Sequence, residues 1–185
     1  FTLSRRDPAY VGRSKEVDAV EKRRVADEAA GDLAALDAEL AGVFEALAGA
    51  GVATDAKATE YGSMLYAKKP GDGSAREQAA SCQKVLGGWA NIANEYATKR
   101  YRSNLINWGM LPFVIPDGDL PFTNHDYLFF PGIRKAVEEK AAEITGYVVD
   151  ANGLKPFTVT LGELTDEERQ IILKGCLINY NRVEK

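Results

Sequence analysis

The segment GDGSARE, residues 71–77, combines residue types that bind anions and move protons. Two glycines precede Ser74 and Arg76, and the apolar segment YGSMLYAK (61–68), with strand propensity, precedes the glycines. A glycine turn that leaves a strand and opens a helix directs backbone N–H groups and the positive end of the helix dipole towards one place. The arginine can add a bidentate contact to a carboxylate there. The segment therefore predicts a substrate-anion site with the serine hydroxyl in a positive environment.

The same residues also have a purely structural interpretation, because Ser74 and Glu77 match the S-x-x-E capping box. In a capping box the serine hydroxyl accepts from the Glu77 amide, and the carboxylate accepts from the Ser74 amide. Gly71 and Gly73 would then supply the tight turn before the helix. Taken alone, the motif favours this interpretation. It lacks the lysine of a nucleotide-binding P-loop and the third glycine of a dinucleotide fingerprint.

The composition bounds the class of protein. The 185 residues are enough for one substantial core, and the net charge of −4 argues against a dedicated nucleic-acid binder. No apolar run reaches the roughly 20 residues that span a bilayer, so no membrane is expected. Cys82 and Cys176 are the two cysteines, which fits a reducing, cytoplasmic setting. The sequence enters at Phe1 in the middle of a basic segment, and we expect it to be part of a longer protein.

The elements that position the GDGSARE turn follow from the pattern of apolar residues. Residues 1–13 are basic without a helical period and are predicted to be an arm. Helices over about 14–30 and 32–48 are predicted to form a hairpin. Strands are then predicted at 61–68, 89–97 and 110–115, with helices at 75–86 and 99–109 between them. This alternation predicts a right-handed, mostly parallel α/β arrangement.

The remaining segments complete a prediction of two parts. They are, in order, a loop after Pro116, a helix near 131–142, a β-hairpin turning at Asn152-Gly153 and a final helix capped by Thr165. An N-terminal arm and helical hairpin would occupy residues 1–55 and pack on the second part. The α/β domain would occupy residues 56–185.

Three ordered motifs resemble the carboxy-terminal swivel domain of the aconitase superfamily. The family's Gly-x-Gly-Ser-Ser-Arg-Glu-His-Ala turn corresponds to residues 71–79, and its Leu-Gly-Gly corresponds to residues 86–88. Its Asn-Leu-x-x-x-Gly-Leu-Leu-Pro passage corresponds to residues 104–112, and the final LTDEERQIILKGCLINYNR resembles the family's last helix. The likeness extends from about Tyr61 to the end of the chain. It implies a swivel-type β/β/α domain with mostly parallel strands, preceded here by the helical hairpin.

The resemblance implies a role for each matching residue. Ser74 corresponds to a serine that, as an alkoxide, removes or returns a proton on carbon during dehydration. Arg76 corresponds to an arginine that binds a substrate carboxylate, and the backbone of Gly73 and Ala75 would contribute to the same clamp. Ala75 replaces the family's second serine, and Gln78 replaces a histidine. Because of these two departures, the resemblance implies the class of reaction more firmly than the identity of the substrate.

The family's other catalytic parts are expected outside this chain. Two cysteines are too few to hold an iron–sulfur cluster alone, so no cofactor or metal is expected here. The resemblance implies a [4Fe–4S] cluster in N-terminal partner domains. We therefore predict a cytoplasmic hydro-lyase domain for a hydroxy di- or tricarboxylate, inactive when alone. Two alternatives stay open: a catalytically silent anion-binding or regulatory module, and a free-standing small subunit like that of isopropylmalate isomerases.

Other residues with chemical potential receive structural interpretations. His125 is the single histidine and has Asp126 beside it, but neighbouring loop residues rarely share one site. Cys82 and Cys176 are predicted to be packing residues. The basic segment at residues 99–102 is interpreted as a solvated helix face.

Overall fold

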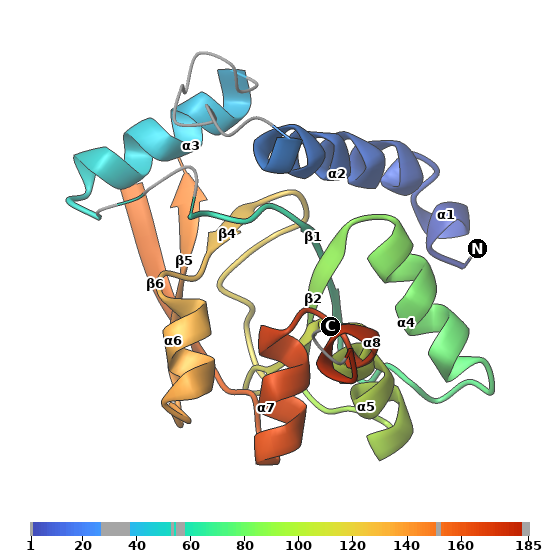
Figure 1. Ribbon diagram of the computed structural model, residues 1–185. Helices are drawn as coiled ribbons and strands as arrows, with labels where there is room; N and C mark the ends of the chain where they lie inside the picture. Colours follow the sequence, from blue (N-terminus) through green and yellow to red (C-terminus); the bar gives the residue numbers. More distant parts are fainter. Residues whose placement is uncertain (1, 27–37, 53, 55–57, 151–152, 183–185) are drawn as a thin grey trace.

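The computed structural model of the chain describes residues 2–26, 38–52, 54, 58–150 and 153–182, which form a mixed α/β structure (Figure 1). The first sheet alternates with helices in the order β1 (Ser63–Ala67), α4 (Arg76–Val85), β2 (Gly88–Ala93), α5 (Lys99–Asn107) and β3 (Leu111–Val114). The next elements are β4 (Tyr127–Phe129), α6 (Ile133–Glu138), β5 (Ile144–Asp150), β6 (Gly153–Val159), α7 (Asp166–Leu173) and α8 (Leu177–Tyr180). The predicted α/β class is confirmed.

The sheet of β1, β2 and β3 is parallel, with β2 in the centre. Along β2 successive side chains face opposite sides of the sheet. Ala90 and Ile92 belong to the core shared with the second sheet, whereas Asn91 contacts Tyr101 on α5. The helices α4 and α5 therefore cover the face opposite the second sheet. Because the strands are parallel, their carboxyl ends meet at one edge, where open α/β sheets bind ligands.

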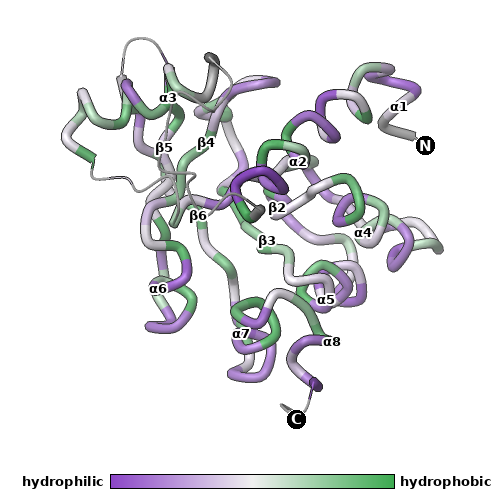
Figure 2. The backbone as a smooth tube through the Cα atoms, turned by 45° about the horizontal axis from the view of Figure 1, so that its top comes forward, coloured by the Kyte–Doolittle hydropathy of each residue, from purple (hydrophilic) through white to green (hydrophobic). Residues whose placement is uncertain are grey.

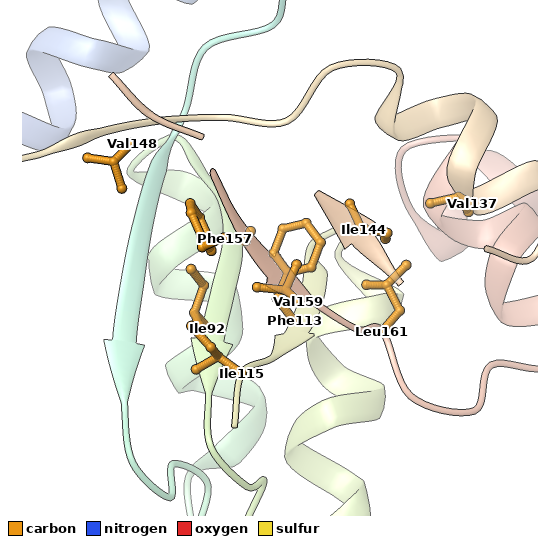
Figure 3. Packing of buried hydrophobic residues seen from close by; sticks show 10 residues of the cluster. Ile92, Phe113, Ile115, Val137, Ile144, Val148, Phe157, Val159 and Leu161 are labelled. Carbon is orange, nitrogen blue, oxygen red and sulfur yellow. The ribbon is translucent and has the colours of Figure 1, made fainter. Parts of the chain in front are cut away.

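The sheet of β4, β5 and β6 is antiparallel, with β5 in the centre. The antiparallel pairing of β5 with β6 confirms the predicted hairpin, although its turn at residues 151–152 lies outside the described residues. The main core lies between the two sheets: Ile92 and Phe113 come from the first, and Val148 and Phe157 from the second (Figure 3). The predicted layers are therefore present, with parallel strands confined to the first sheet.

The N-terminal part begins with α1 (Thr2–Arg6) and α2 (Tyr10–Ala26), so the described residues of the predicted arm are largely helical. Asp7 lies between the two helices and stabilises the junction. Its carboxylate accepts the Ala9 amide at 3.2 Å and also pairs with Arg13. Helix α2 therefore starts at Tyr10, before residue 14, where the sequence predicted it to begin, and the contacts of Asp7 hold the turn that precedes it.

The helix α3 (Ala38–Gly49) packs against β5 and β6 and is mostly hydrophobic, whereas α2 mixes hydrophobic and hydrophilic residues (Figure 2). Phe44 and Leu47 bury their side chains there. The helix α2 instead lies beside the start of β1, where the Glu21 carboxylate accepts the Tyr61 amide at 2.9 Å. The turn predicted to join the two helices lies outside the described residues. No helix in the described ranges has both the length and the hydrophobicity of a membrane span.

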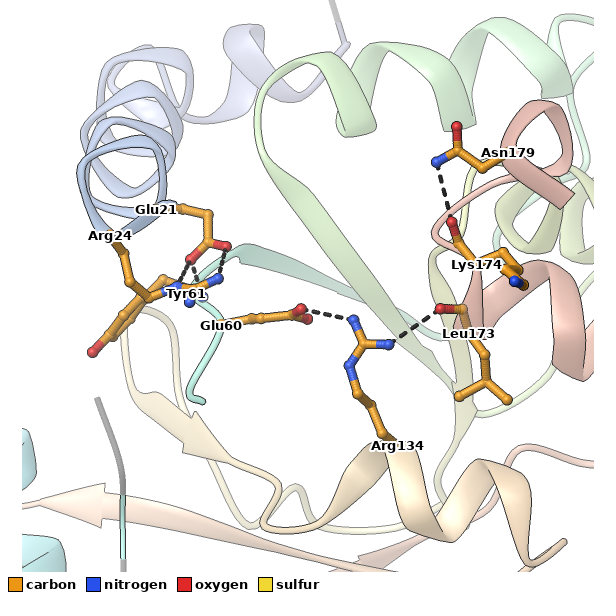
Figure 4. Close-up of polar contacts among 8 residues, drawn as sticks. All are labelled: Glu21, Arg24, Glu60, Tyr61, Arg134, Leu173, Lys174 and Asn179. Atoms are coloured by element: carbon orange, nitrogen blue, oxygen red, sulfur yellow. Dashed lines mark hydrogen bonds and ion pairs between the residues drawn. The ribbon is translucent and has the colours of Figure 1, made fainter. Parts of the chain in front are cut away.

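Arg134 links three segments of the chain that are far apart in the sequence (Figure 4). One Nη group donates to Glu60 Oε1 at 2.8 Å, and the other donates to the Leu173 carbonyl at 3.1 Å. Leu173 ends α7, where the negative end of the helix dipole favours a cation. The guanidinium therefore fastens α6 both to the segment before β1 and to the end of α7.

The helix α7 begins with the predicted cap. The Thr165 hydroxyl accepts the Glu168 amide at 3.1 Å, and the Glu168 carboxylate accepts the Thr165 amide at 2.9 Å. Thr165→Ala should lower the free energy of unfolding by about 1 kcal/mol, measured by urea denaturation, because it removes the acceptor. Thr165→Ser keeps the hydroxyl and should stay close to the original stability. Equal losses in both variants would contradict a capping role.

Candidate functional site

The turn between β1 and α4 lies at the carboxyl edge of the parallel sheet, beside the loop that follows β2. The Lys68 carbonyl accepts the Glu95 amide at 3.0 Å, and the Pro70 carbonyl accepts the Ala97 amide at 2.9 Å. Gly71 has a φ of 98°, and a Cβ atom there would lie 2.4 Å from the Cβ of the Tyr101 side chain. Position 71 therefore requires glycine for its backbone conformation and for space.

The loop residues 73–75, including Ser74, are exposed. Helix α4 begins at Arg76 with Ala75 as its N-cap, and no side chain caps it. The capping box expected from Ser74 and Glu77 is therefore wrong. The Glu77 carboxylate accepts instead from the indole Nε1 of Trp108, at 2.8 Å. The described residues supply no acceptor for the amides of residues 76–78, which leaves these three N–H groups available to an anion.

Arg76 is half-buried, and its guanidinium is held at one side. Its Nε donates to the Gly71 carbonyl at 3.0 Å, and the Thr98 hydroxyl donates to the same carbonyl at 3.1 Å. Thr98 also caps α5 by accepting the Tyr101 amide at 3.2 Å. Among the described residues no acceptor is found for the two Nη groups of Arg76. The arrangement thus presents two parallel donors of the kind that bind carboxylates.

A cluster of buried polar side chains around Tyr101 packs against the glycine turn. The Tyr101 hydroxyl accepts Gln83 Nε2 at 2.9 Å and Asn91 Nδ2 at 2.7 Å, and all three side chains are buried. Burial raises the pKa of the Tyr101 hydroxyl, and the two hydrogen bonds partly oppose this. Tyr101 therefore stays neutral near pH 7 and fixes the packing between α4, β2 and α5.

Asn94 joins the ends of all three parallel strands. It follows β2, and its Oδ1 accepts from the Tyr66 hydroxyl at 2.7 Å. Its Nδ2 lies 3.2 Å from the Ile115 carbonyl and 3.1 Å from the Pro116 carbonyl. The sequence analysis did not single out Asn94, Thr98 or Trp108. For Thr98 a signal was present, because a threonine directly before a helical segment is a preferred N-cap.

The site is an open surface rather than an enclosed cavity. A cleft of about 800 Å³ lies elsewhere, lined by residues that include Lys140, Thr165 and Arg169. Ser74 and Arg76 do not line it. Within the described ranges no group of three or more His, Cys, Asp or Glu side chains could hold a metal ion. At the carboxyl edge of the parallel sheet, the chain thus presents a serine hydroxyl, an arginine guanidinium and backbone N–H groups to an anionic ligand.

The structure separates the other candidates from this edge. His125 is exposed in its loop with a φ of 75°, and Asp126 accepts the Thr123 amide at 2.7 Å. Cys82 is exposed, so its predicted packing role is wrong; it lies on the side of α4 away from buried Ala80 and Gln83. Cys176 is partly buried.

The basic segment at the start of α5 has mixed surroundings. Lys99 and Arg100 are exposed, as predicted for a solvated face. Tyr101 is buried, and the Arg102 guanidinium donates to the carbonyls of Leu161 and Glu163 at 2.9 and 2.6 Å. Tyr101 and Arg102 therefore stabilise the fold, whereas Lys99 and Arg100 face solvent.

Residues 52–118 match the family described as Aconitase C-terminal domain. Over 76 residues the chain is 37% identical to a protein named Aconitate hydratase A from Streptomyces viridochromogenes, covering 39% of this chain and 8% of that protein. The crystal structure of a 3-isopropylmalate dehydratase from Methanocaldococcus jannaschii is similar over 67% of this chain and 65% of that chain, with 26% identity and a TM-score of 0.45. The chain thus spans a small part of the hydratase it matches.

Proposed function

We propose, from the match of residues 52–118 to the aconitase C-terminal domain family, that this chain is the swivel domain of an aconitase-like hydro-lyase. The proposed reaction is the reversible removal of water from a hydroxy di- or tricarboxylate. One observation carries the proposal: exposed Ser74 precedes a helix start that no side chain caps, and the first residue of that helix is Arg76, whose Nη groups have no acceptor among the described residues. These are the donors that a carboxylate substrate requires.

The proposed role of Arg76 and of the first turn of α4 is to hold a carboxylate. The amides near Gly73–Arg76 and the helix dipole favour negative charge, and the guanidinium supplies two further donors. A carboxylate held there orients the adjacent C–H bond towards the Ser74 hydroxyl oxygen. Such orientation lowers the barrier because the reacting atoms already lie in the required geometry.

The proposed role of Ser74 is to move the carbon proton. Its ionised oxygen takes the proton, the C–H electron pair forms the new double bond, and the C–O bond on the neighbouring carbon breaks to release the hydroxyl group. In the hydration direction each of these changes is reversed, and the serine returns the proton to carbon. A serine hydroxyl is a weak acid, so its alkoxide must be stabilised by the same preorganised N–H groups and guanidinium. The site thus uses one positive environment for both the substrate carboxylate and the base.

A [4Fe–4S] cluster, when bound, would supply Lewis-acid chemistry at the leaving hydroxyl. The residues of this chain do not fit that group, since it has two cysteines and the cluster needs about three or four ligands. We therefore assign the cluster to N-terminal partner domains, or to a separate large subunit as in the isopropylmalate-type alternative. Cysteine usage supports a cytoplasmic location.

The proposal is tested by assaying this chain together with its cluster-bearing partner domains or subunit. Hydroxy di- and tricarboxylates are supplied in turn, and the unsaturated product is followed by its ultraviolet absorbance. Turnover that requires both components supports the hydro-lyase assignment. Tight binding of carboxylates without turnover would instead favour the silent anion-binding module.

Arg76→Lys tests the carboxylate clamp. Lysine keeps the positive charge but loses the planar pair of donors and the bond from Nε to the Gly71 carbonyl. We expect KM to rise about tenfold or more, with a smaller change in kcat, because charge-assisted hydrogen bonds to substrate are lost. Arg100→Lys, at an exposed position on α5, is the matched control. An unchanged KM for Arg76→Lys would remove Arg76 from the site.

A further inference from the structure

The motif S/T-x-x-E lies at the start of two described helices, α4 and α7, and it forms a complete capping box only at α7. At α7, Thr165 and Glu168 exchange both hydrogen bonds. At α4, neither bond between Ser74 and Glu77 forms, although the residue types and spacing are equivalent. Helix α4 has Ala75 rather than Ser74 as its N-cap, whereas α7 has Thr165 as its N-cap, and a tertiary contact engages the Glu77 carboxylate.

That contact is the indole N–H of Trp108, which donates to the Glu77 carboxylate at 2.8 Å. Trp108 is the C-cap of α5, and its ring packs against the buried cluster containing Ala80, Leu105 and Met110. The next residue, Gly109, has a φ of 70° and a backbone in close contact with Gly175. The donor is therefore held by the fold, whereas Glu77 is an exposed residue in the first turn of α4.

We propose that Trp108 is a positioning residue that holds the Glu77 carboxylate away from Ser74 and so keeps the first turn of α4 open to a substrate carboxylate. This inference rests on the proposed function. A helix start attracts any nearby carboxylate, whether it belongs to the protein or to the substrate. If Glu77 turned back to the Ser74 amide, the serine hydroxyl would at the same time accept the Glu77 amide. The Ser74 oxygen and an amide of the first turn would then be hydrogen-bonded within the Ser74–Glu77 pair and could not contact the substrate.

Trp108→Phe removes the indole N–H and retains an aromatic ring against the cluster. We expect the Ser74–Glu77 capping box to close and the dissociation constant for citrate to rise about fivefold, the usual strength of a helix cap. In the Glu77→Ala background the same tryptophan substitution should leave citrate binding unchanged, because no carboxylate remains to compete. This loss of the effect is the non-additivity expected of two residues that act through one another.

The experiment follows the backbone amide signals of the isotope-labelled chain by NMR, first with and without Glu77→Ala and then with added citrate. In Trp108→Phe the Ser74 amide signal should move when Glu77 is replaced by Ala, because its hydrogen-bond acceptor is lost, and in the original protein it should move much less. In the assembly with the cluster-bearing partner, KM should rise while kcat changes little. Trp89→Phe is the matched control, because the Trp89 ring packs on Gly62 and Lys84 away from this turn.

The outcomes separate this inference from the proposed function. A Ser74 amide that is insensitive to Glu77 in Trp108→Phe overturns the inference, even if the original protein binds citrate normally. A weakened citrate affinity that persists in the Glu77→Ala background also overturns it, since Trp108 would then act through packing. Closure of the capping box in a protein that never binds carboxylates supports the positioning contact and overturns the proposed function instead.

Discussion

Ser74→Ala is expected to lower kcat of the assembled enzyme by roughly 10²–10⁴-fold, the usual contribution of a positioned acid–base group. The substitution removes the oxygen proposed to take the carbon proton and leaves the proposed Arg76 clamp in place, so KM should change little. Folding should be unaffected. The Ser74 side chain is exposed and donates no hydrogen bond to any described residue, so the thermal midpoint should match that of the original chain.

Ser81→Ala is the matched control for this experiment. Ser81 lies on α4, the helix that follows the Ser74 loop, and its hydroxyl donates to the Gln78 carbonyl at 3.3 Å. Its loss should leave kcat near the original value. Near-normal turnover in Ser74→Ala would remove the proton-transfer role and leave an anion-binding module. A fall in turnover together with a lower thermal midpoint would show that Ser74 acts through the fold.

Gly109→Ala is expected to reduce the free energy of unfolding by about 3 kcal/mol or more, through backbone strain and overpacking together. Gly109 has a φ of 70°, which disfavours any side chain. A Cβ atom there would also lie 1.8 Å from the Gly175 carbonyl oxygen. Because the obstacle is backbone, neither partner can rotate away. The loss is a large share of the roughly 5–15 kcal/mol that stabilises a domain.

Gly132→Ala separates the two causes. Gly132 has a φ of 64°, close to that of Gly109, but a Cβ atom there would meet nothing within 4 Å. Its substitution should cost about 1–2 kcal/mol, which is the conformational part alone. Both variants can be compared by urea denaturation with linear extrapolation. Equal losses would mean that the contact between positions 109 and 175 relaxes without cost.

The first sheet could be predicted because its signals are local. Buried apolar segments, glycine breaks and helix formers alternate from residue 61 to 115, and such a pattern requires parallel strands with helical crossovers. The predicted helix end at Gly109 is present, with the positive φ that glycine permits. The helix at residues 2–6 could not be predicted, because this short segment has no apolar period.

The details of the candidate site could be predicted only in part. The glycine turn and the arginine follow from residue types, but the state of the Ser74–Glu77 pair depends on Trp108, which lies 31 residues beyond Glu77 in the sequence. Burial of Cys82 was inferred from the average behaviour of cysteine. Its exposure depends on which side of α4 meets α5, and this is set by packing across the sheet.

The open position of Ser74 has a consequence for when chemistry can occur. Bulk water screens charges strongly, so at an exposed edge the guanidinium and the N–H dipoles stabilise an ionised hydroxyl only weakly. A covering surface would expel solvent, lower the local dielectric constant and strengthen each of those attractions without moving any atom of this chain. Ser74 would then act as a base only when a partner surface covers it. Without that cover the hydroxyl would stay protonated, and the chain would not take part in unwanted reactions.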